Sequence, residues 1–191
     1  MNNTLVKSKN IFYPPGGILM WIIIFLELIT FGMALIAMVA SYKDAPELFH
    51  NSRLQLNTAI GTINTIFLIT SGFFMAKSVL ELKNQNIKKA SLFLNLTMLG
   101  GALFLLLKSV EYYFKIEAGL TINHNTFFTY YWLLTLFHVI HVIVGLVILL
   151  VVSRSLKKNT INLEDFEASA AFWHMCDLIW LLLFPIIYLI F

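Results

Sequence analysis

The sequence predicts an all-α membrane protein, a polytopic bundle of five transmembrane helices, on two observations. First, 59% of its 191 residues are hydrophobic, only 12% are charged, and the mean hydropathy is +0.82. Soluble domains carry about 25% charged residues, so this composition excludes a soluble globular protein and a disordered chain. Second, five apolar runs are each long enough to cross a bilayer, which takes about 20 residues. The runs are continuous and do not alternate with polar residues, which favours helices.

The five predicted spans form a single membrane domain over residues 1–191. They cover about 17–41, 57–80, 90–113, 127–152 and 166–191, the last including Pro185. The sequence Pro14-Pro15-Gly16-Gly17 marks the entry to the first helix. That first run is too long for the h-region of a cleaved signal peptide, which has about 7 to 15 residues. The predicted linkers of 9 to 15 residues are too short for a soluble domain.

Lysine and arginine residues set the predicted orientation, because cytoplasmic loops of membrane proteins are enriched in them. Eight lie on one predicted side: Lys7, Lys9, Lys83, Lys88, Lys89, Arg154, Lys157 and Lys158. Three lie on the other side: Lys43, Arg53 and Lys115. We therefore expect a cytoplasmic N-terminus and a C-terminus on the opposite side. The net charge of +3 is spread over short loops and does not indicate a nucleic-acid partner.

Ionisable residues inside the predicted spans are the candidate functional groups, since each is costly to bury in lipid. They are Glu27, Lys108, Glu111, His138, His141, His174 and Asp177, with Glu167 at the start of the fifth span. Glu27 lies near mid-bilayer, where we expect it to be largely protonated. It has two open interpretations: a neutral carboxyl bonded to Thr30 or to another helix, or a proton relay.

The spacing of the other groups predicts local pairs. Lys108 and Glu111 are three residues apart, so they share a helix face and can pair, with Lys108 extending toward the membrane surface. His174 and Asp177 have the same spacing.

His138 and His141, with Gly145 on the same face, raise the alternatives of a metal or haem site with His174. Their different depths favour hydrogen bonds between helices instead. We expect this seam, together with Glu111 on the neighbouring span, to face other helices of the chain. Cys176 is the only cysteine, which excludes a disulfide within the chain and a copper–thiolate centre. No catalytic, cofactor-binding or metal-binding residue is predicted.

Five sequence fragments, in order, resemble subunit III of the haem-copper oxidases, the cytochrome c oxidase subunit III family. They are Phe25-Leu26-Glu27-Leu28 with Phe31; Leu56-Asn57-Thr58 with Ser71; Glu111-Tyr112-Tyr113; Phe137-His138-x-x-His141-Val142-x-x-Gly145; and Phe166-Glu167-Ala168 followed by Trp173-His174-x-x-Asp177-x-x-Trp180-Leu181-x-x-Phe184. The resemblance is to a short five-helix form. The long forms have seven helices, and the two N-terminal ones, which enclose a lipid-holding cleft, are absent here.

The resemblance implies a non-redox subunit in a bacterial inner (plasma) membrane that packs on catalytic subunit I and other oxidase subunits. It supports proton uptake and stability during turnover, in a complex that oxidises cytochrome c or a similar donor, reduces oxygen to water and translocates protons. Haem and copper are expected in partner subunits, and the complex can belong to a larger respiratory supercomplex. Phospholipid is expected near Glu27 and His141, and near Glu167 beside the basic loop that holds Arg154, Lys157 and Lys158.

Two alternatives remain open. A subunit-III-like accessory protein of nitric-oxide reductase shares the short form and these motifs. An independent proton-coupled transporter would use Glu27 as its proton carrier.

Overall fold

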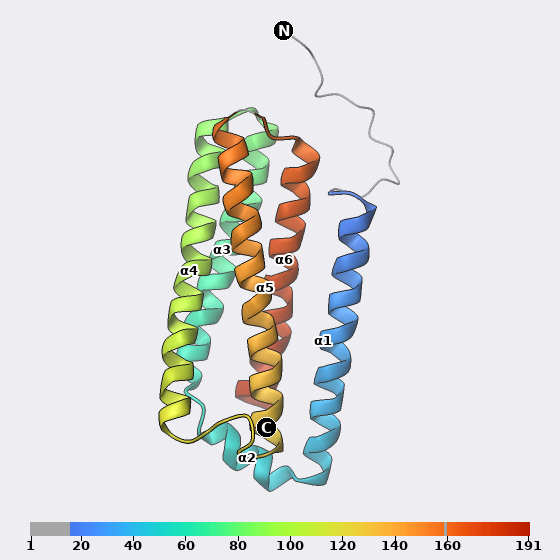
Figure 1. Cartoon of the computed structure of the whole chain (residues 1–191), viewed down its shortest axis with the longest axis vertical. Coiled ribbons are helices and arrows are strands. Elements are labelled where there is room, and N and C mark those ends of the chain that lie inside the picture. The colour runs from blue at the N-terminus through green and yellow to red at the C-terminus, as the bar shows by residue number, and fades with distance from the viewer. Residues whose placement is uncertain (1–15, 159) are drawn as a thin grey trace.

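Five long helices run side by side along the molecular axis in the computed structural model, which describes residues 16–158 and 160–191 (Figure 1). Each is long and apolar enough to span a membrane. Their bounds are α1 Ile18–Asp44, α3 Thr58–Lys83, α4 Ile87–Glu117, α5 Thr126–Lys157 and α6 Leu163–Pro185. The all-α polytopic prediction is confirmed. The predicted entry signal at Pro14 and Pro15, and the charges of Lys7 and Lys9, lie outside the described residues.

The helices are longer than the predicted spans, mainly because polar and charged residues continue the helical backbone beyond the C-terminal end of each of the first four apolar runs. The connections are therefore shorter than expected, only residues 84–86 between α3 and α4 and residues 158–162 between α5 and α6. A short helix was also missed: α2, Pro46–Leu54, lies across one end of the bundle (Figure 1). Its proline occupies the first helical turn, where no backbone N–H is needed.

Pro185 changes the helix type at the C-terminal end of α6. The backbone continues as the π-helical segment η1, Ile186–Ile190. A proline has no N–H to donate to the carbonyl four residues earlier, so the regular α-helical ladder ends there. The wider turn still places Ile187 and Tyr188 in the interior, where both are fully buried.

Asparagine side chains begin three of the long helices. The side-chain oxygens of Asn57, Asn125 and Asn162 accept hydrogen bonds from backbone N–H groups in the first turns of α3, α5 and α6. The first N–H groups of a helix have no partner within it, and a cap of this kind stabilises a helix by about 1 kcal/mol.

Helices α3 and α4 pack as an antiparallel pair through small polar residues. The Ser71 hydroxyl donates to the Thr97 carbonyl at 2.8 Å, and the Ser78 hydroxyl donates to the Ala90 carbonyl at 2.7 Å. Small residues let two backbones approach closely, which is how helices associate in lipid.

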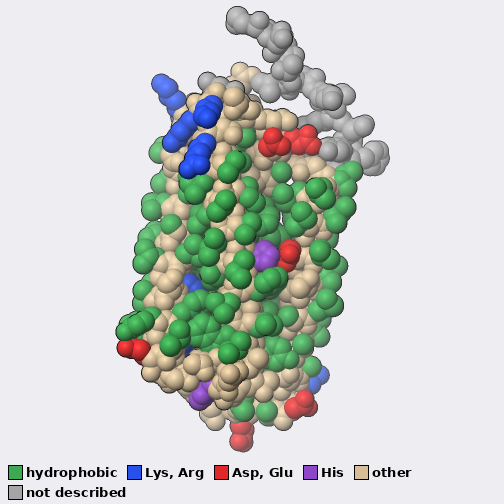
Figure 2. All heavy atoms as spheres, viewed as in Figure 1, with side chains coloured by type: hydrophobic (Ala, Val, Ile, Leu, Met, Phe, Trp, Pro, Cys, Tyr) green, Lys and Arg blue, Asp and Glu red, His purple; other side chains and the backbone are tan. Residues whose placement is uncertain are grey.

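Helix α6 occupies the centre of the bundle, and two tryptophans join it to its neighbours. The indole N–H groups of Trp173 and Trp180 donate to the hydroxyls of Ser71 and Thr65 on α3, at 3.1 and 3.0 Å. Helix α1 lies at the edge of the bundle, against α5 and α6 (Figure 1). The visible side of the molecule is mostly hydrophobic, and lysine and arginine side chains gather at one end of it (Figure 2).

Candidate functional site

The first candidate group joins Glu27 on α1 to His141 on α5. Glu27 Oε2 lies 3.3 Å from His141 Nε2, and their side chains are 21% and 12% exposed. The Thr30 hydroxyl donates to the Leu26 carbonyl, so the predicted hydrogen bond between Glu27 and Thr30 is wrong. Glu27 contacts another helix, α5, through His141. In the space-filling view, a histidine and an acidic side chain meet in the middle of the hydrophobic face (Figure 2).

His138 faces the interior, although it lies only three residues before His141. Its ring is fully buried, stacked on Trp180 at 5.3 Å between centroids and edge-on to Phe104 at 5.6 Å. Neither ring nitrogen has a hydrogen-bond partner among the described residues. The prediction that this seam faces other helices is confirmed for His138, but the predicted hydrogen bonding between helices is wrong for it. Three residues turn a helix by about 300°, so the two rings point about 60° apart.

Lys108 and Glu111 form the most deeply buried ion pair in the described structure. Lys108 Nζ lies 3.0 Å from Glu111 Oε2, and both side chains are at most 2% exposed. The predicted pairing is confirmed, but the predicted extension of Lys108 to the surface is wrong. Its ammonium group instead donates to the Tyr188 hydroxyl at 2.8 Å and approaches the Tyr131 hydroxyl at 3.4 Å.

The two tyrosines complete this pair, and sequence reasoning missed them. The Tyr131 and Tyr188 hydroxyls donate to Glu111 Oε1 at 2.9 and 2.6 Å. Their position within predicted apolar spans could have indicated this contact, because a tyrosine hydroxyl buried in such a span needs a hydrogen-bond partner.

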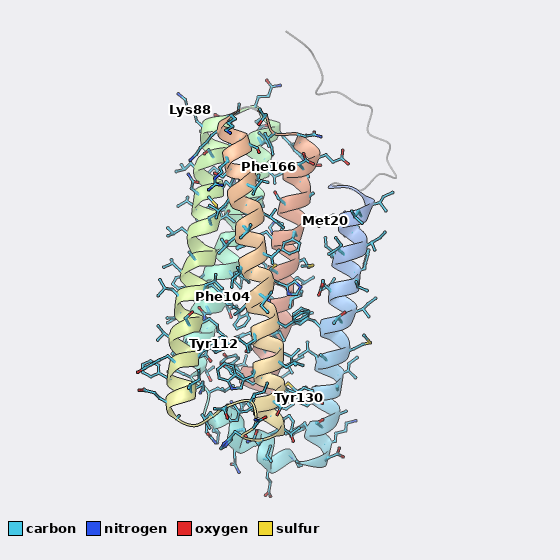
Figure 3. All side chains as sticks on the ribbon, viewed as in Figure 1. Met20, Lys88, Phe104, Tyr112, Tyr130 and Phe166 are labelled. Carbon is cyan, nitrogen blue, oxygen red and sulfur yellow. The ribbon has the colours of Figure 1, made fainter. Side chains whose placement is uncertain are left out.

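Aromatic rings enclose the remaining face of the ammonium group of Lys108. Its Nζ lies 5.1 Å from the ring centre of Tyr112 and 5.2 Å from that of Trp180, within the range of cation–π attraction. Phe104 and Tyr112 both lie on α4 in this part of the bundle (Figure 3). One turn or more beyond Lys108 on α4, the Lys115 ammonium group donates to the backbone carbonyl of Gln55, which directly follows α2.

Helix α6 carries two further pairs. His174 Nδ1 lies 3.4 Å from Asp177 Oδ2, so the predicted contact one turn apart is confirmed. The Asp177 carboxylate occupies the space that a β carbon at Gly72 would need, so a larger residue at this position would collide with it. Glu167 pairs with Lys83 at the end of α3, at 2.7 Å.

An apolar groove of about 510 Å³ runs between α1, α3 and α6. Its walls include Trp21 and Phe25 of α1, Ala76 of α3 and Met175 of α6. The Lys83–Glu167 pair lies at its polar end, and His174 lines its side.

The candidate residues fall into separate pairs rather than one catalytic constellation. Within residues 16–158 and 160–191, no three His, Cys, Asp or Glu side chains are grouped so that they could hold a metal ion. Glu111 lies with Lys108 and the tyrosines and not beside His141, so the expected seam is divided in two.

The comparison with known families decides the identity of this bundle. A family model described as "Cytochrome c oxidase subunit III" matches residues 51–190, which include α3, α4, α5 and α6. The chain belongs to the cytochrome c oxidase subunit III family. The predicted resemblance to subunit III of a haem-copper oxidase is therefore confirmed.

Relatives within the subunit III family carry two kinds of name. The cytochrome bo(3) ubiquinol oxidase subunit 3 of Buchnera aphidicola is 29% identical over 87% of this chain and 84% of its own length. The cytochrome c oxidase subunit 3 of Corynebacterium diphtheriae is 31% identical over 71% of this chain and 67% of its own length. The cytochrome c oxidase subunit 3 of Synechocystis is 32% identical, but the match covers only 59% of that relative.

Proposed function

We propose that this chain is the non-redox subunit III of a bacterial haem-copper terminal oxidase in the plasma membrane. The observation that carries the proposal is the family match over residues 51–190, which includes four of the five long helices. In this proposal the chain packs on catalytic subunit I, and the partner subunits hold the haem and copper. The complex reduces oxygen to water and moves protons outward during aerobic respiration.

The internal pairing of its ionisable groups supports a structural role next to the catalytic subunit. Lys108 and Glu111 bind each other and two tyrosine hydroxyls, so each charge has its partners within the bundle. A rigid polar core of this kind holds the outer faces of the helices in place. In this proposal the chain supports proton uptake by catalytic subunit I and slows the inactivation of that subunit during turnover.

The electron donor of the proposed complex is cytochrome c or a quinol. The named relatives include subunits of both kinds of oxidase, each aligned over more than two thirds of this chain. The donor is therefore a property of the partner subunits in this proposal, and activity has to be measured with each donor.

The proposed orientation places the α3–α4 connection in the cytoplasm. Lys83, Lys88 and Lys89 lie at this end, and Arg154 and Lys157 end α5 nearby. The opposite end has Lys43, Arg53 and Lys115. The difference supports a cytoplasmic N-terminus by the positive-inside rule.

The groove between α1, α3 and α6 supports phospholipid as the bound molecule. Its walls are apolar, and Lys83 at its polar end is 43% exposed and can contact a negatively charged headgroup. We expect phospholipid here, in addition to lipid near Glu27 and His141 as the family resemblance implies. Lipid extraction from the purified complex, followed by mass spectrometry, checks this.

Purification of the tagged chain in mild detergent tests the proposed function. We expect a larger partner with haem absorption bands, and oxygen consumption with either reduced cytochrome c or a quinol. A strain lacking the chain should yield an oxidase that loses activity faster during turnover. Co-purification with a nitric-oxide reductase, or a colourless protein without partners, would contradict the proposal. Proton-coupled uptake by the pure chain in liposomes would favour the transporter alternative.

A further inference from the structure

His174 of α6 places a polar ring on the wall of the apolar groove between α1, α3 and α6. Its side chain is 45% exposed and lines the groove. Seven residues separate His174 from Glu167, so the ring lies about 10 Å deeper along α6 than the Lys83–Glu167 pair. Hydrocarbon chains offer no hydrogen bond, so a polar group exposed at this depth indicates a binding partner that does.

Asp177 and Gly72 fix the orientation of the His174 ring. Asp177 Oδ2 lies 3.4 Å from His174 Nδ1, and the carboxylate is only 11% exposed. A β carbon at Gly72 would overlap with this carboxylate and lie 3.5 Å from His174 Nδ1, so the glycine lets the pair lie against α3. Because Nδ1 faces the carboxylate, the other ring nitrogen, Nε2, is the atom left for a ligand.

Two aromatic rings of α1 form the opposite wall of the groove. Trp21 and Phe25 both line it, with 5.9 Å between their ring centres. Helices α1 and α6 begin at the same end of the bundle, where the backbone of Ala168 lies against Gly16 (Figure 1). Counting along both helices from that contact places Trp21 and Phe25 at the depth of residues 173–177. The aromatic wall and the imidazole therefore meet the groove at the same depth.

This combination fits an uncharged, planar ring with oxygen substituents and a long apolar tail. Aromatic side chains pack well on such a ring. A neutral imidazole nitrogen donates to a carbonyl oxygen or accepts from a hydroxyl, depending on the tautomer. The groove volume of about 510 Å³ lies within the range of pockets for molecules of drug size. We infer that the groove binds the ring of an isoprenoid quinone or quinol, with His174 Nε2 hydrogen-bonded to one ring oxygen.

The choice of ligand rests on the proposal that a quinol is one of the electron donors of the complex. The ring lies deeper than the phospholipid headgroup proposed at Lys83, because a charged headgroup stays near the membrane surface. The inferred role is binding alone. The site holds a quinol within the membrane, beside the catalytic subunit, and so raises its local concentration there.

Tryptophan fluorescence of the full chain in lipid nanodiscs tests the inference with decylubiquinone, a quinone with a short tail. A quinone bound at the groove wall quenches the emission of Trp21 by contact, and Trp21→Phe identifies that part of the signal. His174→Ala removes the ring nitrogen, whereas His174→Gln keeps a group that can donate or accept a hydrogen bond. His124→Ala, at an exposed histidine between α4 and α5, is the matched control.

In the native chain we expect quenching that saturates as the ratio of quinone to lipid rises. His174→Ala should raise the half-saturating ratio about tenfold, the effect of losing one hydrogen bond. His174→Gln should lie between the two, His124→Ala should match the native chain, and Trp21→Phe should lose most of the saturable signal. Quenching that rises in proportion to the quinone, equally in the native chain and in His174→Ala, would overturn the inference. If His174→Ala does not fold, saturation in the native chain and its loss in Trp21→Phe still decide.

The assay contains no oxidase, so its outcome is independent of the proposed function. Saturable binding by a chain whose complex consumes oxygen only with cytochrome c would keep the site and exclude the quinol as donor. Absence of binding by a chain that co-purifies with haem-containing subunits would overturn the site and leave the oxidase proposal intact.

Discussion

The Lys108 ammonium group donates a 2.8 Å hydrogen bond to the Tyr188 hydroxyl, 80 residues later in the chain. The same hydroxyl donates to Glu111 at 2.6 Å. One tyrosine at the C-terminal end of the bundle thus joins both members of a buried ion pair on α4. The packing of η1 and the burial of two opposite charges depend on each other.

Replacing Lys108 by methionine should strongly destabilise the bundle. The side chains have similar volumes, but Lys108→Met leaves the Glu111 carboxylate buried without its cation, a loss of about 3 to 5 kcal/mol. The double variant Lys108→Met with Glu111→Gln should recover most of that loss, because no charge remains buried. Thermal unfolding in detergent, followed by size-exclusion chromatography, gives the order of the three proteins.

The pair formed by Lys83 and Glu167 is the matched control for this prediction. It has a similar distance, 2.7 Å, but Lys83 is 43% exposed. Exposed pairs contribute at most about 1 kcal/mol, so Lys83→Gln should have little effect. Equal effects of Lys83→Gln and Lys108→Met would show that burial does not determine the energy of these pairs.

Gly145→Ala should weaken the contact between α5 and α6. A β carbon at Gly145 would lie 2.9 Å from the ring of Trp173, which is fully buried and cannot move aside freely. We expect a loss of about 1 to 3 kcal/mol, typical of overpacking. Gly32→Ala on α1 is the control, because nothing lies within 4 Å of its β carbon. It should be neutral or stabilising, and the reverse order of the two variants would contradict the packing described here.

Ser71→Ala should loosen the centre of the bundle by removing two hydrogen bonds at once. The hydroxyl accepts from Trp173 and donates to the Thr97 carbonyl. Hydrogen bonds between membrane helices are each worth about 0.6 to 2 kcal/mol, so a loss near the sum is expected. Ser109→Ala, which removes only a bond within α4, should have a much smaller effect on the midpoint of unfolding.

Glu27→Gln and Glu27→Ala should separate a structural role from a role in proton transfer within the proposed oxidase. Glutamine can still donate to His141, so the complex should assemble and consume oxygen at the native rate. Alanine removes the link between α1 and α5 and should lower the yield of assembled complex or its lipid content. Initial rates and their decay over many turnovers are the measurement. A fully assembled Glu27→Gln complex with a several-fold slower initial rate would instead support proton transfer.

Helix positions could be predicted from the sequence because long apolar runs leave few alternatives, and the spans agree with the structure to within a few residues. The short helix α2 could not be predicted in this way, because it has only nine residues and is polar on the whole. Pairs within one helix, Lys108–Glu111 and His174–Asp177, follow from spacing alone. Contacts between helices cannot be predicted from spacing, because the sequence does not give the rotation of each helix about its axis. That rotation buries His138 and brings His141 to Glu27.

The spacing of Lys108 and Glu111 also bears on how the protein is made. Helices enter the membrane in the order of synthesis, and α4 emerges well before Tyr188 exists. A lone lysine and a lone glutamate would each hinder partition of α4 into lipid by about 2.5 to 3.5 kcal/mol. Three residues apart on one helix, they can neutralise each other from the start. Each charge on α4 therefore has a counter-ion on the same helix while α4 inserts. Tyr131 of α5 and Tyr188 of η1 can bind the pair only after their own segments have been inserted.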